Sequence, residues 1–110
     1  MDLDTDKLLQ DMMDAARKVL KKKWPSAKSY AENEFQKLLE EAVHIGELKD
    51  EGKIEEDEAA YLMALQRNAA RTVMLTLEGL GIIAVEDMLN AALAVARDAI
   101  NSALGGWKLL

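Results

Sequence analysis

The stretch Ala70–Ala103, ARTVMLTLEGLGIIAVEDMLNAALAVARDAINSA, decides the fold because one apolar stripe runs through all of it. The members of this stripe are spaced 4-3-4-4-3-4-4-3-4, which is an eleven-residue repeat. A helix with this period stays nearly straight or supercoils slightly to the right. We therefore expect the stripe to face a partner along its whole length. We call it the seam, and it consists of Ala70, Met74, Leu77, Gly81, Val85, Met88, Ala92, Ala96, Ala99 and Ala103.

The seam belongs to one long predicted helix over residues 55–104. Acidic residues Glu55–Glu58 begin it, where the amino-terminal end of the helix dipole favours negative charge. No proline and no strong stop follow until Gly105 and Gly106. At about 1.5 Å per residue, such a helix is about 70 Å long.

Two shorter helices are predicted before it, over residues 5–24 and 26–51. Asp4 or Thr5 caps the first helix. Pro25 breaks the chain, because it has no amide hydrogen and disfavours helical angles in the residue before it. Gly52 ends the second helix, because glycine readily adopts the left-handed conformation that closes a helix.

These elements predict a single all-α domain over residues 1–110, built as an elongated helical hairpin with a broken first arm. In this register Pro25 lies as far before Gly52 as Gly79 lies after it, so we predict a hinge at Pro25, Gly79 and Gly81. If the hinge serves only packing, Gly79→Ala should be neutral or stabilising. Gly81→Ala should be harmful, because Gly81 lies on the seam. The alternative fold is a compact three-helix bundle in which the first helix folds back.

The long helix has more apolar surface than one hairpin covers. An ordinary surface helix buries a stripe somewhat over 100° wide, whereas polar residues occupy less than half of the circumference between Val73 and Leu104. Two-fold pairing into a dimer that resembles a four-helix bundle is the simplest way to cover it. A helix of another protein could use the same face. We therefore predict a structural or interaction module, with a homodimer as its first expected assembly.

Composition excludes several other functions. The net charge is −6, which argues against a nucleic-acid partner, because phosphate binding needs a basic surface. There is no cysteine for a disulfide, a thiolate metal site or nucleophilic catalysis, and the three serines lie near predicted helix ends. The acidic start of the chain does not resemble a signal peptide, so we expect a cytoplasmic location, and we predict neither enzymatic activity nor a cofactor.

A membrane surface is the second candidate partner. Cations surround a tryptophan near the end of the first predicted helix, a combination that membrane-surface helices use. The alternative is that these cations face water and are favoured by the carboxyl end of the helix dipole. This patch consists of Lys18, Lys21, Lys22, Lys23 and Trp24.

A metal-binding bundle is the third candidate function. Glu41 and His44 have the spacing of the Glu-x-x-His ligand pair in ferritin-like di-iron bundles, which places both side chains on one helix face. The seam offers no inward carboxylate to complete such a site. A solvated histidine among acids is therefore the simpler interpretation, and no metal is predicted.

One further pattern lies in the carboxy-terminal half of the chain, and it consists of Gly52, Lys53, Ile54, Glu56, Asp57, Glu58, Leu62, Ala70, Leu75, Gly79 and Asn90. Through these residues this half resembles a family of small uncharacterised bacterial helical-hairpin proteins of similar length. Glu55 departs from the pattern, because such proteins more often have a capping threonine there. The resemblance implies the fold alone and brings no activity, cofactor or catalytic residue.

Overall fold

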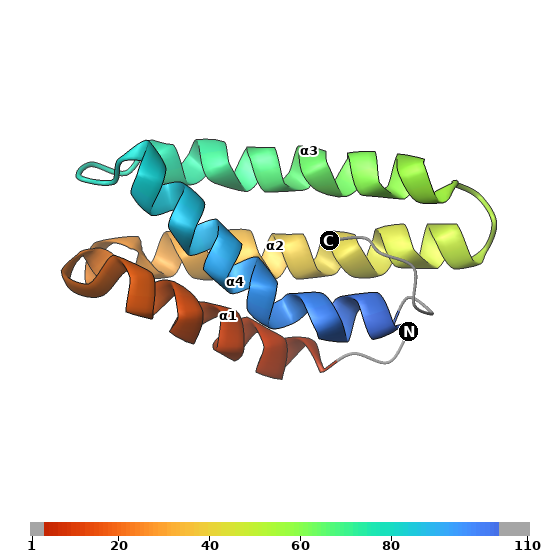
Figure 1. The fold of residues 1–110 in the computed structure, drawn as a ribbon, viewed down its shortest axis with the longest axis horizontal. Helices are drawn as coiled ribbons and strands as arrows, with labels where there is room; N and C mark the ends of the chain where they lie inside the picture. The colour runs from red at the N-terminus through yellow and green to blue at the C-terminus, as the bar shows by residue number, and fades with distance from the viewer. Residues whose placement is uncertain (1–3, 104–110) are drawn as a thin grey trace.

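The structure, a computed structural model, describes residues 4–103, and this part of the chain is built from helices alone. Successive α-helices run in opposite directions (Figure 1). The chain therefore forms an antiparallel bundle in which α4 begins beside the end of α3 and runs obliquely towards α1. The elements are α1 (Thr5–Leu20), the short 3-10 helix η1 (Lys21–Lys23), α2 (Trp24–Asp50), α3 (Glu56–Leu75) and α4 (Ile82–Ala103).

The first connection reverses the chain before Pro25 is reached. α1 ends at Leu20, and Lys21 has φ 53° and ψ −115°, angles that L-residues rarely adopt. Pro25 falls in the first turn of α2, where backbone N–H groups have no acceptor within the helix, so proline loses no hydrogen bond there. The predicted helices 5–24 and 26–51, laid end to end, are therefore replaced by two helices that fold back on each other.

The second connection lies at the glycine that the sequence marks as a stop. Gly52 has φ 74°, and backbone N–H groups of Gly52 and Lys53 donate to the carbonyls of Lys49 and Leu48 at 3.0 and 2.9 Å. These bonds satisfy carbonyls that the end of α2 leaves open. The acidic first turn of α3 then follows, with Glu55 in extended conformation before it.

The long helix predicted over residues 55–104 is wrong. α3 ends at Leu75, where the Thr76 hydroxyl donates to the Val73 carbonyl at 2.6 Å, and α4 starts only at Ile82. Between them Gly79 has φ 87°. Two glycines close together cost a continuous helix about 2 kcal/mol relative to alanine. Folding back also lets the α1–α4 layer bury its inner face against the α2–α3 layer of the same chain.

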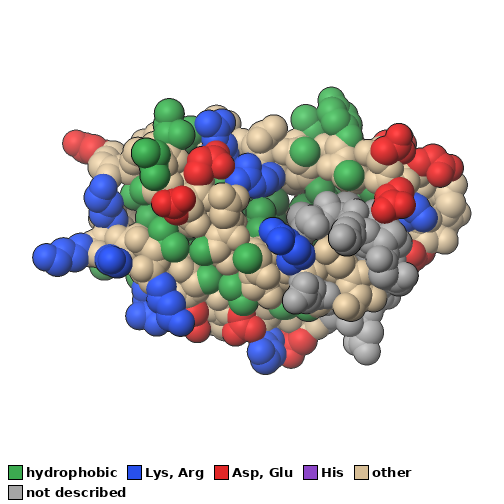
Figure 2. All heavy atoms as spheres, in the orientation of Figure 1, with side chains coloured by type: hydrophobic (Ala, Val, Ile, Leu, Met, Phe, Trp, Pro, Cys, Tyr) green, Lys and Arg blue, Asp and Glu red, His purple; other side chains and the backbone are tan. Residues whose placement is uncertain are grey.

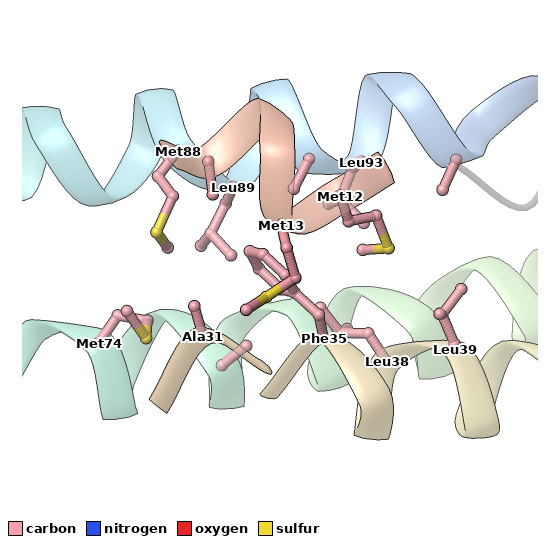
Figure 3. Close-up of a cluster of buried hydrophobic side chains, with 14 of the residues drawn as sticks. Met12, Met13, Ala31, Phe35, Leu38, Leu39, Met74, Met88, Leu89 and Leu93 are labelled. Atoms are coloured by element: carbon pink, nitrogen blue, oxygen red, sulfur yellow. The ribbon is translucent and has the colours of Figure 1, made fainter. Parts of the chain in front are cut away.

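The bundle consists of two layers of two helices each. α1 packs most extensively on α4, and α2 packs on α3. Figure 3 shows the side chains between the layers, with Met12, Met13, Met88, Leu89 and Leu93 on one side. From the other layer come Ala31, Phe35, Leu38, Leu39 and Met74. Phe35, Met12, Met74, Met88, Leu89 and Val85 are the largest fully buried side chains among the described residues.

The elongated hairpin is therefore wrong as the shape of the single chain, although its helix partners are retained. The molecule measures 43 × 23 × 17 Å, well short of about 70 Å for a straight final helix. The three-helix alternative correctly folds α1 back, but it lacks the break between α3 and α4. Both arms of the hairpin bend at one level, and the result is a four-helix bundle of about half the expected length.

Gly79 and Gly81, the two glycines between α3 and α4, should respond to substitution in the order opposite to the one expected from the sequence. Gly79→Ala should destabilise the fold by about 1–2 kcal/mol, because its left-handed conformation disfavours a Cβ atom. Gly81→Ala should be nearly neutral, because an added Cβ at Gly81 meets nothing within 4 Å and its φ is ordinary. Denaturant unfolding of dilute protein measures both effects. A larger loss for Gly81→Ala would contradict this structure of the loop.

Candidate interaction surface

The seam is part of the core of the folded chain and does not form a free surface. Leu77 and Ala99 are partly buried against the core, Gly81 is exposed, and the side chain of Ala103 lies outside the described residues. In this state the α1 and α2 helices of the same chain provide the apolar cover that the sequence assigns to a partner. The buried members are Ala70, Met74, Val85, Met88, Ala92 and Ala96.

The two chain breaks meet at one end of the bundle. A crevice of about 150 Å³ lies between the α1–α2 connection and the α3–α4 connection. The first connection and the start of α2 contribute Lys22, Lys23, Ser26 and Ala27 to its lining, and the α3–α4 connection contributes Leu77, Glu78 and Leu80. Pro25, one residue before Ser26, and Gly79, one residue before Leu80, therefore belong to neighbouring segments. The segments that carry the predicted hinge residues are therefore neighbours, as parts of two adjacent reversals. We call this region the joint, and it comprises residues 21–27 and 76–81.

A polar network that the sequence analysis missed ties α3 to α4. The Arg67 guanidinium donates to Glu86 Oε2 at 3.0 Å and to Asn90 Oδ1 at 2.8 Å, while Arg71 Nε pairs with Glu86 Oε1. Donation from Arg67 is the main cause that lowers the pKa of the Glu86 carboxyl below its ordinary value. The sequence contains a pattern that indicates this network. Two arginines lie four residues apart on one helix, and Glu86 and Asn90 lie four residues apart on the next.

The tryptophan of the predicted basic patch is buried, although its lysines are at the surface. Lys18, Lys21, Lys22 and Lys23 are exposed, whereas Trp24 is only 8% exposed and belongs to the core. The tryptophan therefore packs inside the bundle. Two exposed apolar side chains at the same end of the bundle (Figure 1) are Ile82 and Ile83, 60% and 78% exposed, in the first turn of α4.

The candidate metal ligands Glu41 and His44 both lie on α2. His44 is exposed and Glu41 is partly exposed on α2. Over residues 4–103, no group of three His, Cys, Asp or Glu side chains is arranged to hold a metal ion. None of the helices described is both long and apolar enough to cross a membrane.

Two grooves run between neighbouring helices. The α1–α2 groove, about 600 Å³, has Leu9, Leu39 and Val43 on its floor, and its other lining residues are Thr5, Asp6, Gln10, Glu32, Gln36 and Glu40. The α3–α4 groove, about 230 Å³, is lined by Ala60, Met63, Ala64, Arg67, Asn90, Leu93 and Arg97. Beside it, the outer face of α3 exposes Tyr61 and Leu65, at 63% and 45%.

Comparison of the chain with protein-family models, with curated proteins and with solved structures finds no match. The resemblance to bacterial helical-hairpin proteins therefore stays a prediction. The argument about function depends on the geometry of the seam, the joint and the exposed side chains.

Glu86→Gln should destabilise the bundle at neutral pH by removing the charge that both arginines bind. A carboxyl whose pKa is lowered in the folded state adds stability above its unfolded pKa, which is near 4.5. That stability is lost as the pH falls through the lower pKa of the folded state. The melting temperatures of the wild type and the variant should therefore differ at pH 7 and converge in acid, as followed by circular dichroism.

Asp87→Asn is the matched control, because it removes a neighbouring negative charge from an exposed position. It should leave the melting temperature nearly unchanged at pH 7. An equal effect of the two substitutions would show that net charge matters and that the network does not.

Proposed function

We propose that the protein is a non-enzymatic interaction module that self-associates through the seam, by exchanging one pair of helices with a second copy. The observation that carries this proposal is the joint, which brings both chain breaks together at one end of the bundle. A bundle with two adjacent connections at one end can open there while each helix pair stays intact. The cytoplasmic location expected from the sequence belongs to the same proposal.

The contacts of the bundle define the pairs that would move. α1 with α4, and α2 with α3, make the two most extensive helix contacts, while α3 and α4 share much less contact although they are consecutive in the chain. Opening the joint would preserve both extensive contacts and expose the surface between the layers. Two opened copies would then restore this surface by packing the α1–α4 layer of one on the α2–α3 layer of the other. Exchange of identical elements is a low-cost route to a dimer because the dimer repeats the contacts of the monomer.

Backbone strain at the joint opposes the closed chain. Lys21 holds a positive φ that costs a non-glycine residue about 1–2 kcal/mol. A straight chain would relieve this strain, because three lysines and Trp24 are compatible with helix, but it would place Pro25 inside a kinked helix at a cost of about 3 kcal/mol. The opened hairpin is the elongated form that the eleven-residue repeat predicts. In that form the seam of one copy faces its partner along its length.

Opposing substitutions in the joint test the exchange. Lys21→Gly should stabilise the closed monomer, since glycine accepts a positive φ, and Gly79→Ala should destabilise it and favour a straight helix. Each substitution should change the stability of the closed chain by about 2 kcal/mol. A dimer contains two joints, so its free energy of dissociation should change by about 4 kcal/mol, or roughly a thousandfold in the dissociation constant. Size-exclusion chromatography with light scattering over a concentration series should give more dimer for Gly79→Ala and less for Lys21→Gly.

Gly52→Ala is the matched control for backbone strain. Gly52 has φ 74° and no atom within 4 Å of an added Cβ, like Gly79, but its turn is the same in the closed and open chains. This variant should unfold more easily and keep the monomer–dimer equilibrium of the wild type. The absence of dimer at any concentration in all of these proteins would overturn self-association.

A helix of another protein is an alternative to the second copy, and the α3–α4 groove with Tyr61 and Leu65 beside it is the observation that favours it. Exposed aromatic and aliphatic side chains next to a groove are typical of sites that receive an amphipathic helix. Replacing both Tyr61 and Leu65 by Ser should weaken binding of a partner helix to this outer face. The exchanged dimer should tolerate the same change, because these side chains do not lie between the layers.

A further inference from the structure

The cations of this acidic protein are concentrated in one segment. Residues 15–31 contain six Lys and Arg side chains and no Asp or Glu, although the whole chain has a net charge of −6. All six side chains are exposed. We call them the basic block, and they are Arg17, Lys18, Lys21, Lys22, Lys23 and Lys28.

The fold places the basic block at the joint end of the bundle. Its members belong to the end of α1, to η1 and to the first turns of α2, which meet at the left end of Figure 1. Figure 2 shows Lys and Arg side chains gathered at this end and acidic side chains near the opposite end, where the α2–α3 turn lies. The two ends of the molecule therefore differ in charge, and a negatively charged surface would attract it end-on.

The same end carries two largely exposed isoleucines. Ile82 and Ile83 open α4 and are 60% and 78% exposed. Leu77 and Leu80, in the loop just before them, line one crevice with Lys22 and Lys23, so the apolar loop and the basic block are neighbours. The acidic residues here are Glu78 in this loop, Glu86, which is bound by Arg67 and Arg71, and the exposed Asp87.

We infer that the joint end of the bundle docks on an anionic lipid surface. The basic block would meet the headgroups, while Ile82 and Ile83 would enter the boundary between headgroups and acyl chains. Cationic side chains near a negative leaflet each add to the affinity, and apolar side chains bind by leaving water. A nucleic acid would also attract the cations, but it offers nothing comparable for two adjacent exposed isoleucines. This inference does not depend on helix exchange and replaces Trp24 with the isoleucines as the inserted group.

Sedimentation with vesicles of mixed phosphatidylserine and phosphatidylcholine tests this docking. The wild type should bind at low salt, lose affinity as salt rises, and bind vesicles of phosphatidylcholine alone far more weakly. Changing Lys21, Lys22 and Lys23 together to Gln should weaken binding about a hundredfold, at about fivefold per lysine. Changing Ile82 and Ile83 together to Ser should weaken it about tenfold or more.

Two control variants separate the site from general charge and hydrophobicity. Lys7, Lys37 and Lys53, which lie outside the basic block, should tolerate a triple change to Gln with little effect on binding. Tyr61→Ser removes an exposed apolar side chain from the outer face of α3 and should bind like the wild type. Circular dichroism verifies that every variant remains helical.

The absence of cysteine allows a direct measure of insertion. An environment-sensitive fluorophore on Ile83→Cys should shift to the blue with anionic vesicles, and the same label on Tyr61→Cys should not. Lack of binding at low salt, an equal loss in the two triple-lysine variants, or equal shifts at both labels would overturn the docking. Equally tight binding of an RNA oligonucleotide that ignores the isoleucine changes would assign the basic block to nucleic acid and overturn it as well.

Discussion

The structure depends on the packing of the α1–α4 layer against the α2–α3 layer. Met13 from one layer lies beside Phe35 from the other, and the seam residues Met88 and Met74 lie opposite each other in the same core (Figure 3). Methionine and phenylalanine fill this space beside many alanines, which lets the helices approach closely. The turns let one chain supply both layers. Polar links such as Arg67 to Glu86 then fix α3 on α4 where apolar contact is sparse.

The sequence predicted the helix faces and the partners of each helix, because burial periodicity survives any choice of connection. It did not predict the reversals at Lys21 and at residues 76–81. Three lysines are good helix formers, so nothing local marks the end of α1 at Leu20. The seam also stays in phase across the second break, since Leu77 and Gly81 fit the eleven-residue spacing. Folding back is decided by burial of the α1–α4 layer against the α2–α3 layer, a tertiary term that a single-helix pattern does not contain.

Less of the candidate site than of the fold could be predicted. The cations at Lys21–Lys23 were identified, but Trp24 was expected at the surface and is buried. Ile82 and Ile83 were overlooked because a continuous helix gives them no special position, whereas the first turn of α4 exposes both. The joint thus connects two proposals about different partners. Its backbone would govern exchange with a second copy, and its exposed side chains would govern contact with an anionic surface.

One distance tests most directly whether the two layers can separate at the joint. Gln10 and Gln36 line the α1–α2 groove, so spin labels on cysteines at these positions should be close in the monomer. Diluting the labelled chain with unlabelled chain leaves one labelled copy per dimer. Pulsed electron paramagnetic resonance then reports the distance between the two labels within that copy. In the dimer we predict about 39 Å along the axis of the straightened α1–α2 arm, at about 1.5 Å per residue. The same short distance in monomer and dimer would contradict exchange of the helix pairs.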